Sequence, residues 1–278
     1  MRRTVFGLIC LLFSCLPVAA DDWLKTLMLF DAGRYEEALE LATPFAEDGN
    51  LFALEMLYAS YTYGYGVPVD RVQALAWLRK GAELGDPGSQ DAMGHHYFEG
   101  IGVAPDHVEA LRWFRLAAEQ NHAAATYSIG VMTLNGHGIK ADAAQGWQFI
   151  QRAAELDNPD ALFLLAGTLM NNGATAESVD TAMHYLLRAA QLGQRQASAM
   201  LGVLLEDFPE DPEHRVKSAF HYQLAVAAGC SDVKKEAARA VARLSPDEVE
   251  ALEYHLALGK PETDPRDPQS IPGQCLAG

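Results

Sequence analysis

The sequence is poor in cysteine and in basic residues, and long apolar runs are missing from most of its length. Only 4 of its 278 residues are cysteine, and 21 Lys and Arg stand against 37 Asp and Glu, which gives a formal net charge of −16. This charge repels nucleic acid and anionic lipid, and it suits either a basic partner or a simply solvated surface. Beyond the N-terminus, no segment approaches the ~20 consecutive apolar residues that cross a bilayer.

Patterns typical of catalytic centres are also missing. The chain has no Gly-x-Ser-x-Gly, no His-Glu-x-x-His and no Gly-x-x-x-x-Gly-Lys. Ser231 and Lys234 match Ser-x-x-Lys, but the Ser-Asp-Asn and Lys-Thr-Gly partners of that motif are absent. We therefore predict that Ser231 caps a helix, with an enzyme acting on the cell wall through Ser231 as the alternative. His95 and His96 point about 100° apart on a helix, so no metal or other cofactor is expected.

The first 20 residues have the pattern of a secretory signal peptide. Arg2 and Arg3 precede an apolar stretch from Val5 to Leu16, and small residues lead up to Ala20. Cleavage after Ala20 would deliver the protein to the periplasm or the medium. A loose lipobox ending at Cys15 leaves a membrane-anchored lipoprotein as the alternative.

Two cysteines remain after such a cleavage, Cys230 and Cys275. An even count in an oxidising compartment is compatible with one disulfide that ties the C-terminal tail to the body of the protein. Two free thiols are the alternative.

Internal repetition is the strongest signal in the chain. Trp77, Trp113, Phe149 and Tyr185 follow one another at intervals of 36 residues, and Gly, Asn or Asp recurs at 85, 121, 157, 193 and 229. In the fifth unit the aromatic is expected to have slipped by one residue, to Tyr222. The predicted unit is a helix, a loop, a second helix and a short turn.

Each unit contains further landmarks in the same phase. Gly-x-Gly pairs begin at residues 64, 100 and 136, and they are expected to adopt positive φ. Asp70, Asp106 and Asp142 follow these loops and should cap the second helix. Small residues in the first helix should let the second helix approach closely; they are Gly94, Gly130, Ala166 and Gly202.

Together these motifs resemble the Sel1-like repeat family, a relative of the tetratricopeptide repeat with a longer interhelical loop. The resemblance covers residues 50–229 and implies an all-α, right-handed superhelical solenoid. Five repeats are assigned to 50–85, 86–121, 122–157, 158–193 and 194–229. A tetratricopeptide-like capping hairpin is predicted at 21–49, capping helices at 230–259, and an irregular proline-rich tail at 260–278.

The tetratricopeptide resemblance implies that the first helix of each repeat lines a concave wall. Several apolar side chains in the third and fourth repeats would face this wall, which indicates either a groove for a peptide or tight coiling that buries the stripe. The predicted partner-binding residues are Phe52, Glu55, Tyr63, Asp91, His95, Phe98, Tyr127, Val131, Leu134, Phe163, Met170, Asn171, Val203 and Glu206.

The function expected from these observations is a non-enzymatic scaffold of the bacterial cell envelope. Its partner would be a protein or peptide, of basic character if the acidic residues at the wall contribute to recognition. No nucleic acid is expected to bind, and no transmembrane segment is expected in the mature chain.

Overall fold

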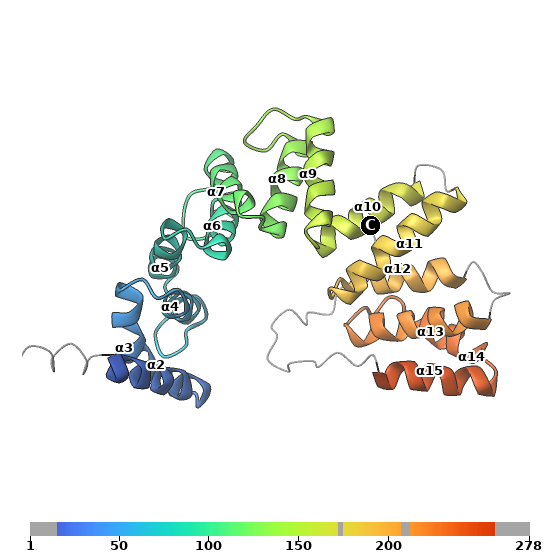
Figure 1. Cartoon of the computed structure of the whole chain (residues 1–278), viewed down its shortest axis with the longest axis horizontal. Coiled ribbons are helices and arrows are strands. Elements are labelled where there is room, and N and C mark those ends of the chain that lie inside the picture. Colours follow the sequence, from blue (N-terminus) through green and yellow to red (C-terminus); the bar gives the residue numbers. More distant parts are fainter. Residues whose placement is uncertain (1–15, 172–174, 207–211, 259–278) are drawn as a thin grey trace, which may run out of the picture. The chain divides into compact units, whose positions relative to one another are not determined.

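The structure, a computed structural model, describes residues 16–171, 175–206 and 212–258. Every element within these ranges is a helix (Figure 1). The helices are α2 (Leu16–Asp31), α3 (Tyr35–Glu47), α4 (Leu51–Tyr63), α5 (Arg71–Glu83), α6 (Pro87–Glu99), α7 (His107–Glu119), α8 (Ala123–Asn135), α9 (Ala143–Glu155), α10 (Pro159–Asn171), α11 (Ala176–Gln191), α12 (Arg195–Glu206), α13 (Pro212–Ala227), α14 (Lys234–Ala242) and α15 (Pro246–Leu258).

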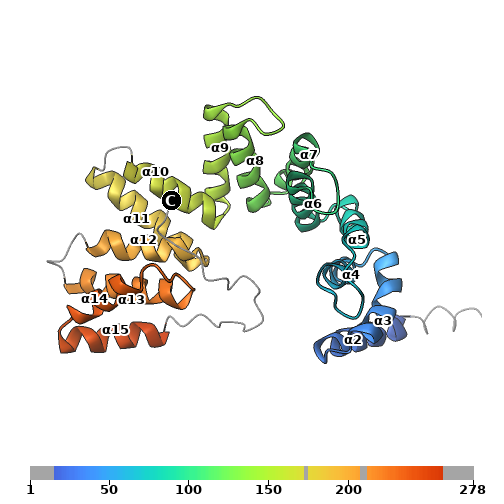
Figure 2. The same ribbon diagram turned by 180° about the vertical axis from the view of Figure 1, so that it is seen from behind.

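The chain divides into two compact units, residues 1–146 and 147–278, which are described separately. Within each unit, helices that follow one another in sequence lie side by side in pairs, as the opposite views of Figures 1 and 2 show. This confirms the predicted all-helical stack of hairpins. Within the described ranges, none of the helices is both long enough and apolar enough to span a membrane.

Aspartate caps start the second helix of the repeats, as predicted. A carboxylate oxygen of Asp70 accepts hydrogen bonds from the amides of Val72 and Gln73 at 3.0 and 3.1 Å. Asp106 does the same at the start of α7, and Asp142 accepts from the amide of Gln145 at 3.0 Å. These caps satisfy amides that otherwise lack a partner at a helix start, which fixes where each second helix begins.

The turn that ends each repeat also keeps its phase. Backbone φ is positive at Asn121 (61°) and Asp157 (65°), and at the glycines that hold the same position, which are Gly85, Gly193 and Gly229. Gly49 adopts the same conformation and lies 36 residues before Gly85. The hairpin α2–α3 therefore ends with the same turn as the repeats that follow it.

The second glycine of each Gly-x-Gly loop touches the preceding hairpin. A Cβ on Gly66 would lie 2.6 Å from the amide nitrogen of Glu36 and 2.7 Å from the carbonyl carbon of Tyr35, where α3 begins. Gly102 lies in the same way against the backbone of Arg71, and Gly138 against that of His107. Positive φ alone would admit any residue tolerant of that conformation, but this backbone contact leaves no room for a side chain.

Small residues in the first helices let aromatic rings come close. A Cβ on Gly94 would lie 2.6 Å from Cδ1 of Phe114, and one on Gly202 would lie 2.7 Å from Cδ1 of Tyr222. Tyr222 therefore holds the position of Phe114, three repeat lengths further on, and the ring of each is almost fully buried. The prediction that the aromatic residue of the fifth repeat has shifted by one position to Tyr222 is wrong. Tyr222 corresponds to the buried Phe114, and His221 holds the position of Trp113.

The aromatic row at 77 and 113 packs between neighbouring hairpins. Trp113 of α7 is 5% exposed and shares a core with Leu75 and Leu78 of α5 and with Met93 of α6. Trp77 packs in the same way on the core formed by α3 and α4. The prediction that these rings fill the seams between repeats is confirmed for these two positions.

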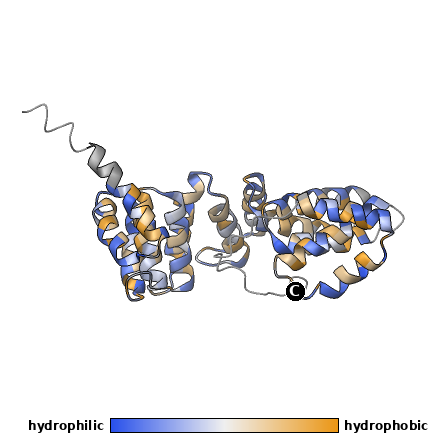
Figure 3. Ribbon diagram, turned by 90° about the horizontal axis from the view of Figure 1, so that it is seen from below, coloured by the Kyte–Doolittle hydropathy of each residue, from blue (hydrophilic) through white to orange (hydrophobic). Residues whose placement is uncertain are grey.

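The C-terminal helices close the second unit with an apolar core of their own. Val216 and Tyr222 of α13 pack with Val233, Ala237 and further buried residues of α14 and α15. Figure 3 shows hydrophobic and hydrophilic residues interspersed along the helices. The predicted proline-rich tail at 260–278 lies outside the described residues, as do residues 172–174 and 207–211.

Candidate functional site

A cleft of about 450 Å³ opens in the first unit between α4, α5 and the start of α6. Two of the predicted partner-binding residues, Phe52 and Glu55, line it. The complete lining is Leu51, Phe52, Leu54, Glu55, Tyr58, Trp77, Leu78, Asp86, Gly88, Ser89 and Ala92. A volume of this size is within the range of ligand-binding pockets.

The rim of the cleft is unusually apolar for a surface. Asn50 caps α4 by accepting a hydrogen bond from the amide of Ala53 at 3.1 Å, so the first residues of the helix are held in place. Phe52 is nevertheless 71% exposed, and its neighbour Leu51 is 43% exposed. Two adjacent large apolar side chains at the mouth of a cleft offer a contact surface for another molecule.

The charges of the cleft are all negative. Glu55 and Asp86 line it, and no Lys, Arg or His does. Asp86 also caps α6, where its Oδ2 accepts a hydrogen bond from the amide of Ser89 at 2.7 Å, so its carboxylate is held in one orientation. Lys80 lies 5.9 Å from the centre of the Trp77 ring, but its ammonium donates to the carbonyl of Glu47 at 2.7 Å. The cleft therefore presents a negative potential beside an apolar surface.

Hydrogen bonds tie one wall of the cleft to the next repeat. The hydroxyl of Tyr58 is 3.0 Å from Nε2 of His96, and Nδ1 of His96 is 2.7 Å from the carbonyl oxygen of Ile101. Because Nδ1 must donate to that carbonyl, Nε2 accepts from the tyrosine in the neutral ring. Burial raises the pKa of Tyr58. The wall is thus fixed before any ligand arrives.

A second polar cluster lies on α6 beyond the cleft. Asp91 is 3.8 Å from Nε2 of His95 and 3.9 Å from Nδ1 of His122, which precedes α8. Its Oδ1 is buried without a hydrogen-bond partner. Burial raises the pKa of Asp91, and the two histidines oppose that rise. Two predicted site residues, Asp91 and His95, therefore lie together, and His122, which was not predicted to be part of the site, lies beside them.

The predicted aromatic residues Tyr63 and Phe98 join ring clusters at the Gly-x-Gly loops. Tyr63 is 60% exposed and its ring is 5.8 Å from that of Tyr65. Phe98 stacks on His107 at 4.9 Å and lies 5.5 Å from His137. These rings sit where each loop meets the preceding hairpin, so they serve the stacking of repeats.

The apolar side chains of α8 are covered more than the predicted open wall implies. Tyr127, Val131 and Leu134 are all partly buried. Leu134 lies against α9, because a Cβ on Gly146 would be 2.7 Å from its Cδ2. Leu134 therefore packs within its own hairpin.

The predicted residues of the second unit are also largely enclosed. Phe163 and Met170 of α10 are partly buried, and Asn171 at its end is exposed. Val203 of α12 packs against the C-terminal core.

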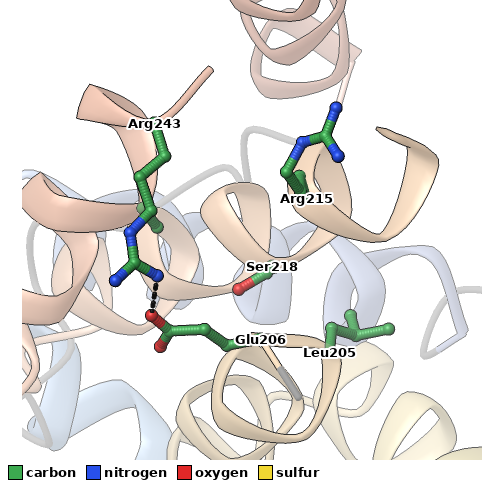
Figure 4. A pocket seen from close by; sticks show the side chains of 6 residues that line it. Leu205, Glu206, Arg215, Ser218 and Arg243 are labelled. Carbon is green, nitrogen blue, oxygen red and sulfur yellow. Dashed lines mark hydrogen bonds and ion pairs between the residues drawn. The ribbon is translucent and has the colours of Figure 1, made fainter. Parts of the chain in front are cut away.

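Glu206 is occupied by contacts inside the second unit. It accepts a hydrogen bond from Arg243 at 2.6 Å and another from the hydroxyl of Tyr222 at 3.1 Å. Figure 4 shows the small cavity of about 40 Å³ beside this pair, with Ser218 and Arg215 at its edge. Arg243, the residue directly after α14, therefore balances the negative charge of Glu206.

The comparisons with known proteins agree with the geometry of the repeats. A family model described as the Sel1 repeat matches residues 55–86, 87–122, 123–158 and 159–194, which together make up half of the chain. The chain belongs to the Sel1 repeat family. The family model does not extend over the predicted fifth repeat at 194–229, although α12 and α13 pack there as a helical pair.

Solved structures of other Sel1 repeat proteins have the same fold. A Sel1 repeat protein from Oxalobacter formigenes is 28% identical and aligns with a TM-score of 0.67, over 86% of this chain and 100% of that one. The protective antigen c5321 of uropathogenic Escherichia coli, which has an SLR fold, is 26% identical with a TM-score of 0.59, over 74% of this chain and 44% of that one. No curated protein matches the chain at a significant level.

Two predictions about the C-terminal part of this Sel1 repeat protein can be compared with the structure. The predicted cap at Ser231 is wrong, because α14 begins at Lys234 and Val233 holds the capping position without a side-chain bond. The buried Cys230 is disulfide-bonded. Its predicted partner Cys275 lies outside the described residues, so their pairing stays a prediction.

Several residues that line the cleft of this Sel1 repeat protein were not among the predicted partner-binding residues. Leu51 and Tyr58 occupy the same face of α4 as Glu55, at a spacing of four and three residues. The helical spacing alone could therefore have predicted that Leu51 and Tyr58 lie on the same face as Glu55. The sequence indicates only that Asp86 can cap a helix. That it lines the same cleft as Glu55 depends on how the helices pack. No group of three or more His, Cys, Asp or Glu suited to a metal ion occurs in the described part of the chain.

Proposed function

We propose that this protein is a non-enzymatic scaffold that holds a partner protein at the cleft between α4, α5 and α6. The observation that supports this most directly is the exposure of Phe52, 71%, at the mouth of a cleft that is otherwise well formed. Sel1 repeats present stacked helices whose side chains contact other proteins, and the described helices offer no arrangement of groups typical of a catalytic centre.

We further propose that the scaffold works in the bacterial cell envelope. The support is the signal-peptide pattern at residues 1–20, with Arg2 and Arg3 before an apolar stretch. Mass spectrometry of the mature N-terminus checks this directly. A chain that begins at Asp21 is the expected product, whereas a lipid-modified Cys15 would favour the anchored form and an intact Met1 would contradict export.

Site-specific photocrosslinking tests the scaffold at the cleft. A benzophenone amino acid replaces Phe52 in the full chain, and the protein is produced and irradiated in its native cells. The control carries the same group at Val72, which is 69% exposed on α5 and does not line the cleft. Both positions are at helix starts in the same repeat, so they differ mainly in the surface they sample.

The expected result is a crosslinked product of defined mass from position 52 that position 72 does not give. The product should contain a second protein, identified by its peptides. Equal crosslinking from both positions, or none from position 52 while the protein is folded and at its usual level, would contradict the proposal.

A further inference from the structure

We infer that the cleft recognises an arginine side chain in an extended segment of the partner. This inference rests on the proposed scaffold function and names the chemistry of its site. The arginine would place its guanidinium against the carboxylates of Glu55 and Asp86 and its aliphatic stem across Phe52.

Charge is the first argument. The cleft lining includes Glu55 and Asp86 and no basic side chain. Glu55 forms no ion pair with any residue that the structure describes, and the whole chain carries a net charge of −16. A cation in the cleft would therefore meet two local carboxylates within a negative long-range potential, whereas an anionic segment would be repelled.

The orientation of Asp86 is the second argument. Its Oδ2 accepts a hydrogen bond from the amide of Ser89 at 2.7 Å, which holds the carboxylate at the start of α6. A fixed carboxylate loses little conformational freedom when it binds a planar donor, and guanidinium offers parallel N–H groups that match carboxylate oxygens. Lysine has the same charge but lacks this planar pair of donors.

The apolar rim is the third argument and favours a peptide over a free amine. Phe52 and Leu51 are exposed, and they line the same cleft as the two carboxylates. An aromatic face attracts a guanidinium and its aliphatic stem, and the leucine beside it can contact the next residue of a peptide. A small cation would leave this apolar surface uncovered.

The hydrogen bonds behind the cleft support a preformed site. Tyr58 is held by His96, and His96 is held by the carbonyl of Ile101 in the following loop. Because these bonds do not involve a ligand, binding requires little rearrangement of the wall. The cost of ordering the site on binding is correspondingly small.

The test uses the full mature chain and two synthetic peptides that differ in one side chain. Both are fluorescein-labelled peptides of the sequence Gly-Ser-Leu-X-Leu-Ser with an amidated end, where X is arginine or its neutral analogue citrulline. Fluorescence anisotropy gives the dissociation constants. The arginine peptide should bind at least about tenfold more tightly than the citrulline peptide, and rising salt should reduce the difference.

Charge-neutral variants of the protein assign the effect to the cleft. Glu55→Gln removes one carboxylate, and Asp86→Asn removes the other while keeping a residue that caps helices well. Each should weaken binding of the arginine peptide about tenfold and leave the citrulline peptide unchanged. Glu40→Gln, at an exposed position of α3 that does not line the cleft, is the control and should change neither.

Several outcomes would overturn the inference. They are equal affinities for arginine and citrulline, no binding of the arginine peptide, an equal loss in the Glu40→Gln control, and free agmatine binding as tightly as the peptide. If Phe52 still crosslinks to a partner in cells while arginine gives no advantage, the scaffold stands and only the arginine specificity fails. Loss of crosslinking as well would remove both.

Discussion

Alanine at Gly66 should loosen the N-terminal hairpin from the repeats, whereas alanine at Gly33 should not. Both glycines have nearly the same left-handed backbone, with φ of +71° and +74°. A Cβ on Gly33 would meet nothing within 4 Å, but a Cβ on Gly66 would lie 2.6 Å from the amide nitrogen of Glu36 and 2.7 Å from Tyr35. The pair therefore separates the cost of the backbone conformation from the cost of the contact between repeats.

The expected magnitudes follow from these distances. Alanine in the left-handed region costs about 1 kcal/mol at either position. At Gly66 the loop must also retreat by roughly 1 Å to reach an ordinary contact of about 3.5–4.0 Å. This retreat weakens the stacking of Tyr65 on Tyr35, whose ring centres are 5.1 Å apart, and such a pair contributes about 0.5–1.5 kcal/mol. The total for Gly66→Ala is therefore about 1.5–2.5 kcal/mol, against about 1 kcal/mol for Gly33→Ala.

Two measurements on the full chain check this difference. Urea unfolding followed by circular dichroism gives the midpoints, and hydrogen exchange of the amides in α2 and α3 reports whether the terminal hairpin opens on its own. Gly66→Ala should lower the midpoint clearly more than Gly33→Ala and should speed exchange in α3. Equal midpoints and equal exchange in the two variants would refute the reasoning that the second glycine is required by a contact with the preceding hairpin.

Four further substitutions have definite expected outcomes. Burial lowers the pKa of His221 to about 4, so the unfolded chain takes up a proton first as pH falls from 6.5, and stability is lost between about pH 6.5 and 4. His221→Phe should remove roughly 3 kcal/mol of this pH-dependent loss of unfolding free energy. The urea midpoint of the variant should then differ less between pH 4.5 and pH 7 than that of the parent protein. Burial raises the pKa of Asp91, so the ionised carboxylate destabilises the fold increasingly as pH rises above its ordinary value of 3.8. Asp91→Asn should therefore raise the urea midpoint more at pH 8 than at about pH 4, where the difference between folded and unfolded chain is small. Gly167→Ala should stabilise α10 by up to about 1 kcal/mol, because nothing lies within 4 Å of the new Cβ. Gly202→Ala should destabilise the second unit, because its Cβ would lie 2.7 Å from Tyr222. Thermal unfolding of the two variants should therefore give melting temperatures that shift in opposite directions.

The repeating parts of the fold were readable from the sequence because their causes are local. An aspartate before a helix, such as Asp70, caps it with its own side chain, and a turn such as that at Asn121 depends on the conformation of one residue. The turn recurs in all five repeats and the aspartate cap in the first three, so the 36-residue period predicted where each of them lies. The same local reasoning failed at Ser231, where the helix begins three residues later than its cap position implies.

The candidate site was only partly readable because it depends on contacts between helices. Helical spacing placed Leu134 on the predicted wall, but its side chain packs on Gly146 of the next helix. Glu206 was expected to contribute negative charge to the wall, but Arg243, which follows α14 more than thirty residues further along the chain, balances that charge. Phe52 and Glu55 were identified, whereas Asp86 lines the same cleft as Glu55 only because α4, α5 and α6 pack in succession.

The contact between each Gly-x-Gly loop and the hairpin before it has a consequence for how such a protein can change in length. Each interface of this kind is formed by the Gly-x-Gly loop of one repeat and the start of the second helix of the preceding hairpin, as in the contact between Gly102 and Arg71. Duplicating or deleting a complete repeat of 36 residues preserves the contact between each loop and the preceding hairpin. Deleting a few residues from one loop removes that contact between two repeats. Genes for this architecture can therefore lengthen or shorten the array in whole steps without redesigning any interface.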